Sequence, residues 1–270
     1  MRQRRLLVQV GVAAVLLGLL ALLVNNLAVN LIRTGLGLGF GWLDRPAGFA
    51  LAETALSYDP SDSYLWALTI GWLNSLKVIA AGLVLATVLG VAAGAARSSS
   101  NRLLRSLAGG YVALIRQVPL LLQLLFWYFV AFLGLPSVPI GGLIRLSNQG
   151  IQLLGLNLSV EFCAVLVGLT VFTGASIAEI VRGGINAVPR GQWEAFRSLG
   201  LGEGLGLRRI VLPQALPAIL PALTSQYLNL AKNSTLAIAV GYADLYAVSD
   251  TTITQTGRAI EGNLLLLLSL

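Results

Sequence analysis

The sequence predicts an all-α fold, a polytopic bundle of about six membrane-spanning helices in a single domain, residues 1–270. Hydrophobic residues make up 56% of the chain and charged residues 11%, less than half the share found in an average soluble domain. Several apolar runs also reach the length of roughly 20 residues that a helix needs to cross a bilayer. Composition and run length together indicate a multi-pass membrane protein.

Six apolar runs follow one another along the chain. They are Leu6–Val24, Val78–Ala96, the segment from Arg116 to about Leu135, Phe162–Ala178, Ile210–Ala231 and a final run that starts near Ala259. The final run reaches only to Leu270, which is too short to span a membrane. We therefore expect the last helix to be truncated in this chain.

Residues 1–24 predict the first membrane helix. Basic residues precede its apolar run, as they do in a secretory signal peptide. However, Leu6–Val24 is long for the hydrophobic region of a signal peptide, and Asn25 and Asn26 after it make a poor cleavage site. The sequence therefore favours a helix that stays in the protein.

Residues 25–64 predict an insertion on the outer side, ahead of a core at residues 65–270. Its glycine-punctuated part, Gly35–Trp42, lacks the following Gly-Lys-Ser/Thr of a phosphate-binding loop. The segment Tyr58–Ser63 is rich in Asp and Ser and predicts a turn. We expect Phe40 and Trp42 to lie at the membrane interface.

The basic residues predict the orientation of the helices. With the N-terminus in the cytoplasm, most of the 18 basic residues fall on the inner side. They are Arg2, Arg4, Arg5, Arg97, Arg102, Arg105, Arg182, Arg190, Arg197, Arg208 and Arg209. The net charge of +7 then reflects this orientation and contact with anionic lipid headgroups, and it does not indicate nucleic-acid binding.

Composition also excludes several classes of function. The chain has no histidine, and its single cysteine, Cys163, lies within an apolar run. The sequence therefore predicts no metal site, no intrachain disulfide and no His-based catalytic triad. We expect no catalytic residue and no cofactor in this chain.

The loop Gly183–Leu212 is unusually long for a connection between two apolar runs, and it predicts a short amphipathic helix. Pro189 suits the first turn, while Trp193, Phe196 and Leu199 follow at three-residue steps on one face. Gly200 can end such a helix in the left-handed conformation.

This loop resembles the EAA loop of the permease subunits of ABC importers. Glu194-Ala195, Gly200 and Ile210-x-Leu212-Pro213 match that motif in order and spacing, whereas Phe196 stands where the third position is usually Ala. Flanking segments are similar to those of polar amino-acid permeases, namely Asn74-Ser75-Leu76, Arg116-Gln117-Val118-Pro119, Lys232-Asn233-Ser234-Thr235-Leu236 and Gly241-Tyr242-Ala243-Asp244-Leu245.

The resemblance implies the MetI-like fold of type I ABC importers and a location in the bacterial inner membrane. It implies that this chain encloses a path for polar amino acids with a second permease subunit, either a paralogue or a copy. The long outer insertion favours two different permeases. The resemblance further implies a substrate-binding protein outside and ATPase subunits inside, which hold the ATP and Mg and receive Trp193, Glu194, Ala195 and Phe196.

Polar residues in or near the apolar runs are candidates for lining that path. They are Lys77, Arg116, Gln123, Glu179, Asn229, Lys232, Asn233, Ser234 and Thr235. Charged side chains near the end of a span can instead extend to the lipid headgroups, and Arg116 and Glu179 can form an ion pair with each other.

Pro213, Pro217 and Pro221 recur on one face of the fifth run. They either begin the helix and relax against neighbouring helices, or bend a helix that lines the path.

The alternative hypothesis is a self-contained secondary transporter or channel. Such a protein would be expected to show inverted repeats or more carboxylates within the membrane. The sequence shows no convincing repeat, so we favour the importer subunit.

Overall fold

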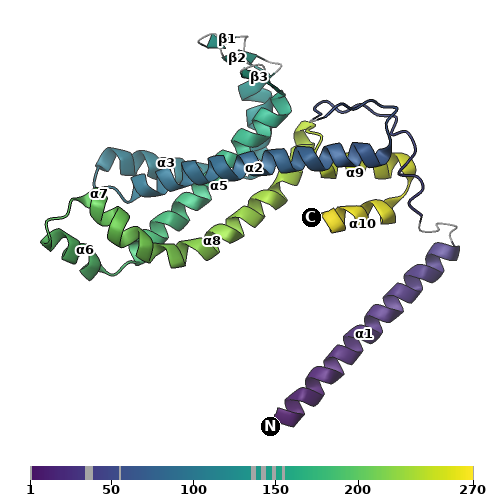
Figure 1. The fold of residues 1–270 in the computed structure, drawn as a ribbon, viewed down its shortest axis with the longest axis horizontal. Helices are drawn as coiled ribbons and strands as arrows, with labels where there is room; N and C mark the ends of the chain where they lie inside the picture. Colours follow the sequence, from purple (N-terminus) through teal and green to yellow (C-terminus); the bar gives the residue numbers. More distant parts are fainter. Residues whose placement is uncertain are drawn as a thin grey trace.

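The computed structural model describes residues 2–33, 39–54, 56–134, 138–140, 144–147, 150–153 and 156–269, and these are largely helical. Figure 1 shows a long bundle with one helix standing apart from it. The predicted all-α class is confirmed, with four short strands in addition.

Three of the described helices are long and apolar enough to cross a membrane. They are α1 (Arg2–Arg33), α2 (Tyr64–Arg97) and α5 (Val160–Ala187). Helix α1 stands apart from the others (Figure 1), and an 18-residue window of it is entirely exposed. It also continues past the predicted boundary at residue 24, so part of the predicted insertion is helical.

The third predicted run is broken. Helix α3 (Arg102–Gln117) is followed by α4 (Leu120–Leu125) and the π-helix η1 (Phe126–Phe132), and the two parts meet at 105°. Pro119 causes the break, because proline lacks an amide donor and disfavours helical geometry at the residue before it. The apolar-run analysis missed α3 because this helix is amphipathic and Arg102, Arg105 and Arg116 interrupt its apolar residues.

Four short antiparallel strands connect η1 to α5 at one tip of the molecule (Figure 1). They pair in sequence order and comprise β1 (Val138–Ile140), β2 (Ile144–Ser147), β3 (Gly150–Leu153) and β4 (Leu156–Leu158). The sequence analysis did not predict them. Their signal is the alternation of apolar and polar residues, as in Ile-Arg-Leu-Ser and Ile-Gln-Leu.

The remaining elements form the C-terminal third. They are α6 (Arg190–Ser198), α7 (Glu203–Gly206), the π-helix η2 (Leu207–Val211), α8 (Leu212–Asn233), the 3₁₀ helix η3 (Ser234–Val240), α9 (Leu245–Thr256) and α10 (Ala259–Ser269). Helical structure is continuous from α7 through η2 to α8. The non-helical part of the predicted loop 183–212 is therefore shorter than expected.

Trp42, expected at the membrane interface, is buried within the chain. Its side chain is buried against Tyr64, with ring centroids 5.7 Å apart, whereas Phe40 is exposed. The predicted turn at Tyr58–Ser63 is present, where the amide of Asp62 donates to the carbonyl of Asp59 (2.8 Å).

Helices α2 and α5 lie side by side over much of their length (Figure 1). Small residues permit this close approach, as is common between membrane helices. A Cβ atom at Gly90 would lie 2.5 Å from the Cβ of Ile177, and one at Gly94 would lie 2.7 Å from that of Val181. Helices α2 and α5 are therefore the central packed pair of the core.

We expect Gly90→Ala to destabilise the protein by about 1–3 kcal/mol, because overpacking forces the two helices apart. Gly110→Ala on α3 is the matched control. A Cβ there would meet no described atom within 4 Å, and alanine favours the helix by up to about 1 kcal/mol. Thermal unfolding of the detergent-solubilised protein tests this. Equal midpoints for Gly90→Ala and wild type would show that α2 and α5 can separate freely.

Candidate functional site

Helix α6 is fixed to the rest of the chain by Phe196, which is fully buried. Phe196 belongs to a buried apolar cluster that also includes Ile185 of α5 and Ile219 of α8. A Cβ at Gly206 would lie 2.4 Å from the Phe196 ring, so the absence of a side chain at Gly206 makes room for the ring. Phe196 is therefore not the exposed anchor for an ATPase that the sequence analysis expected.

Helix α6 ends in a Schellman motif. Gly200 has φ 68°, the left-handed conformation that was predicted for it. The amide of Leu201 donates to the carbonyl of Phe196 (3.1 Å), and that of Gly200 donates to the carbonyl of Arg197 (3.0 Å). The chain can thus reverse sharply and bring α7 back against α6.

The opposite face of α6 is exposed. Glu194 and Ala195 lie on it, and the side chain of Leu199 just past the helix is 75% exposed. Arg197 forms an ion pair with Glu203 of α7 (2.9 Å), which links the two short helices at their surface. A small, mixed apolar and charged surface therefore projects from a rigid support.

Of the other residues predicted to couple to the ATPase, some pack against the core and one is exposed. Trp193, Ile210 and Leu212 are half-buried and pack against the same core as Phe196. Pro213 is exposed at the start of α8.

Helix α8 presents one exposed face that carries prolines and polar residues. Pro217, Pro221, Asn229 and Lys232 are all exposed. Each proline within the helix removes the amide that would bond to the carbonyl four residues earlier, so carbonyl oxygens are also available along α8. This face therefore offers polar groups on the side turned away from the core of the chain.

The other residues predicted to line the path in this part of the chain lie at the end of α8 and the start of η3. Asn233 and Thr235 are half-buried and Ser234 is buried. The hydroxyl of Ser234 donates to the carbonyl of Ala231, and that of Thr235 to the carbonyl of Lys232 (2.8 Å each).

Glu179 lies among three arginines. It pairs with Arg97, with Arg182 (2.9 Å) and, more distantly, with Arg116 (3.9 Å). The cluster ties the ends of α2, α3 and α5 together. This arrangement corresponds to the ion-pair alternative for Arg116 and Glu179.

Gln123 is buried at the break between α3 and α4. Its Nε2 atom donates to the carbonyls of Ile115 and Val118 (2.9 Å each), two acceptors that the break leaves without helical partners. Its contacts are those of a structural residue.

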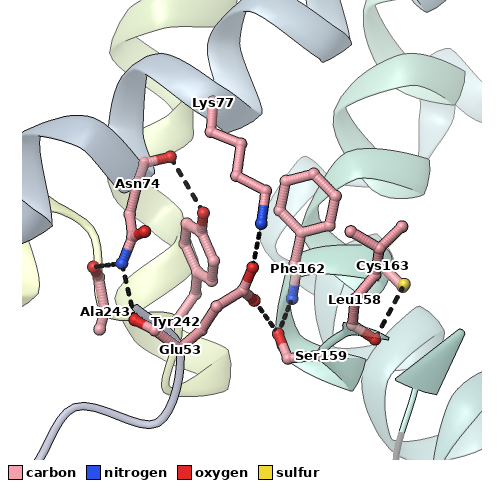
Figure 2. Close-up of polar contacts among 9 residues, drawn as sticks. All are labelled: Glu53, Asn74, Lys77, Leu158, Ser159, Phe162, Cys163, Tyr242 and Ala243. Carbon is pink, nitrogen blue, oxygen red and sulfur yellow. Dashed lines mark hydrogen bonds and ion pairs between the residues drawn. The ribbon is translucent and has the colours of Figure 1, made fainter. Parts of the chain in front are cut away.

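Lys77 is engaged within the chain. Figure 2 shows its ammonium directed at Glu53 of the insertion, whose other carboxylate oxygen accepts from the hydroxyl of Ser159. The ammonium also lies 4.3 Å from the centroid of the Phe162 ring. The expectation that Lys77 faces an open path is therefore not met in this conformation.

Asn74 joins this cluster to the segment before α9 (Figure 2). Its Nδ2 atom donates to the carbonyls of Glu53 and Ala243 (2.9 Å each), and the Tyr242 hydroxyl donates to the Asn74 carbonyl (2.9 Å). The motif pieces at residues 74–76 and 241–245, far apart in sequence, thus meet in space. Sequence reasoning missed Glu53 and Ser159, since a single acid in a loop carries no distinctive pattern.

The predicted site residues described above form hydrogen bonds, ion pairs and packing contacts. Within the described residues, no group of three or more acidic or cysteine side chains could hold a metal ion.

Comparisons with known proteins agree with this geometry. The family model of binding-protein-dependent transport system inner membrane components matches residues 86–256. YhdX of Escherichia coli (strain K12), named as an amino-acid ABC transporter permease, is 35% identical over 96% of this chain and 87% of its own length. The general L-amino acid transport system permease protein AapQ of Rhizobium johnstonii is 32% identical over 96% and 86%.

Solved structures show the same fold. A chain from a crystal structure of an amino acid ABC transporter with histidines is 30% identical, with a TM-score of 0.59 over 76% of this chain and 86% of that one. A chain of the inward-facing MetNI methionine ABC transporter is 22% identical, with a TM-score of 0.57 over 79% and 93%. The expected MetI-like fold is thereby confirmed.

We expect Glu53→Gln to destabilise the protein by about 1–3 kcal/mol, because it leaves the Lys77 ammonium partly buried without its counter-charge. The double variant Glu53→Gln/Lys77→Met should be less destabilised than the sum of the two single variants. Asp44→Asn, an exposed acid of the same insertion, is the control and should match wild type. Thermal unfolding provides the measurement, and strictly additive effects would argue against the ion pair.

Proposed function

Because the chain belongs to the family of binding-protein-dependent transport system inner membrane components, we propose that it is the permease subunit of an ATP-driven importer of polar amino acids. The substrate class comes from the names of its relatives and from the motifs at residues 116–123 and 232–245. The bacterial inner membrane is its site of action, with the N-terminus in the cytoplasm, as the arginine distribution favours.

The observation that carries the proposal is the construction of α6. Its inner side is held in the core by Phe196, while Glu194, Ala195 and Leu199 face outward. Such a surface suits docking to an ATPase subunit, because a displacement of α6 would be passed through α7, η2 and the shared apolar cluster to α8 and α5. ATP and Mg bind to the ATPase, and this chain performs no bond chemistry.

The exposed face of α8 is the proposed wall of the path. Asn229 and Lys232 supply a donor-rich surface for a substrate carboxylate, and the proline-freed carbonyls supply acceptors for an ammonium. A second permease subunit covers this face, with a paralogue favoured over a copy.

Transport then proceeds by alternating access. A soluble binding protein delivers the amino acid on the outer side, and closure of the ATPases on ATP biases the permease pair between two conformations. A secondary transporter remains the competing function. Purification of this chain in complex with an ATPase separates the two, since a secondary transporter needs no such partner.

We expect Gly200→Val to uncouple ATP hydrolysis from uptake, because a β-branched residue in the left-handed conformation costs about 1–2 kcal/mol and would change the end of α6. Glu194→Lys should weaken ATPase docking while the protein stays inserted. Stimulated ATPase activity and uptake in reconstituted vesicles, with a pull-down of the ATPase, are the measurements. Full coupled transport by both variants would remove α6 from the mechanism.

We expect Lys232→Ala to raise the substrate concentration for half-maximal uptake about tenfold, since a hydrogen bond to a charged group contributes roughly 1.5–3 kcal/mol. Binding of the ATPase should not change. Arg45→Ala, which removes an exposed cation of the insertion, is the control. Wild-type uptake by Lys232→Ala would show that this cation only contacts lipid headgroups.

A further inference from the structure

A second candidate binding region lies outside the exposed face of α8. A cavity of about 560 Å³ opens between α2, η3, α9 and α10. Its volume falls within the roughly 300–1,000 Å³ typical of small-molecule sites. Most of its surface is apolar, and Trp72 and Tyr246 contribute aromatic rings to the lining.

Three polar side chains in this lining, Ser234, Thr235 and Asn263, offer acceptors, whereas Ser75 accepts from the amide of Leu245 (2.9 Å) and keeps its hydroxyl hydrogen as a donor. Ser234 and Thr235 already donate their hydroxyl hydrogens to backbone carbonyls, so only their oxygen lone pairs remain free. Asn263 donates from its amide nitrogen to the carbonyl of Ala259 (2.6 Å) and keeps its own carbonyl oxygen. Among the described residues, no lysine or arginine lines the cavity.

Asp244 adds a negative charge to this set. Its Oδ1 atom caps α9 by accepting from the amide of Ala247 (2.8 Å). Its Oδ2 atom is buried and has no hydrogen-bond partner among the described residues, and the residue as a whole is 1% exposed. Burial raises the pKa of Asp244 to about 7, so a bound cation would favour the ionised carboxylate.

We propose that this cavity binds the ammonium group of an amino acid, with Oδ2 of Asp244 as its charged partner. A buried carboxylate needs a donor or a cation, and the remaining acceptors of Ser234, Thr235 and Asn263 fit the three hydrogens of an ammonium. The aromatic rings of Trp72 and Tyr246 suit a cationic ligand as well. The choice of an amino acid rests on the proposed function, whereas the preference for a cation rests on the lining.

Asp244→Asn tests the inference with little disturbance of the fold. Asparagine caps helices about as well as aspartate, so α9 keeps its cap while the charge is removed. Asp250→Asn is the matched control, because Asp250 is an exposed acid on the same helix and does not line the cavity.

The measurement is titration of the purified complex in lipid nanodiscs, without ATP, with L-glutamine, L-glutamate and L-arginine in turn. Wild type and Asp250→Asn should bind at least one of them equally well. Asp244→Asn should bind it about tenfold to a hundredfold more weakly. The 2-hydroxy analogue of the ligand, which lacks the α-ammonium, should bind wild type more weakly than the amino acid does. If the 2-hydroxy analogue of arginine binds as well as arginine, the cation in the site is the arginine side chain and not the α-ammonium.

Equal affinity of Asp244→Asn and wild type would overturn the inference. So would stabilisation of wild type by sodium chloride but by no amino acid, which would indicate an inorganic cation site. Uptake by vesicles of the same preparation distinguishes the two proposals. If uptake occurs while the nanodiscs bind none of the three probes, the cavity inference fails and the proposed function stands, whereas absent uptake counts against the function itself.

Discussion

The buried side chain of Asn74 joins three segments at one end of the bundle: helix α2, the insertion and the segment before α9. Its amide bonds to the insertion at Glu53 and to the segment before α9 at Ala243. Without it, the carbonyls of Glu53 and Ala243 would lose their hydrogen-bond donor, and the loss at the buried Ala243 carbonyl would cost about 1–3 kcal/mol. The segments joined in this way also carry the Glu53–Lys77 ion pair and Asp244, which lines the cavity.

The two ends of the bundle use different physics. Near Asn74, hydrogen bonds and one ion pair join segments distant in sequence. Near α6, the buried connection is apolar, with Phe196 seated over Gly206, and the Arg197–Glu203 ion pair joins α6 to α7 at the surface. Apolar packing keeps its strength when neighbouring groups shift together, whereas a buried ion pair is sensitive to small changes in geometry. The α6 end is thus suited to transmit movement, and the Asn74 end to change its contacts during transport.

Much of this could be predicted from sequence. Apolar run lengths predicted the helices now seen as α1, α2, α5 and α8, and the glycine at position 200 predicted the end of α6. Run length could not predict α3, because the uncharged stretch between Arg105 and Arg116 is too short to span a membrane. It could not predict the strands either, which are only three or four residues long. Among the site residues, polarity alone identified Lys77 and Gln123, but only coordinates show that their partners lie within the chain.

The two faces of α6 carry different constraints: one face is needed for folding and the other for the proposed docking to a partner. Its inward residue Phe196 serves the fold, whereas its outward residues Glu194 and Ala195 have no packing contact comparable to Phe196–Gly206 among the described residues. Substitutions on the outer side can therefore accumulate without loss of stability, which allows the surface to diversify. A bacterium with several such importers could in this way keep each permease matched to its own motor subunit while every copy retains the same internal framework.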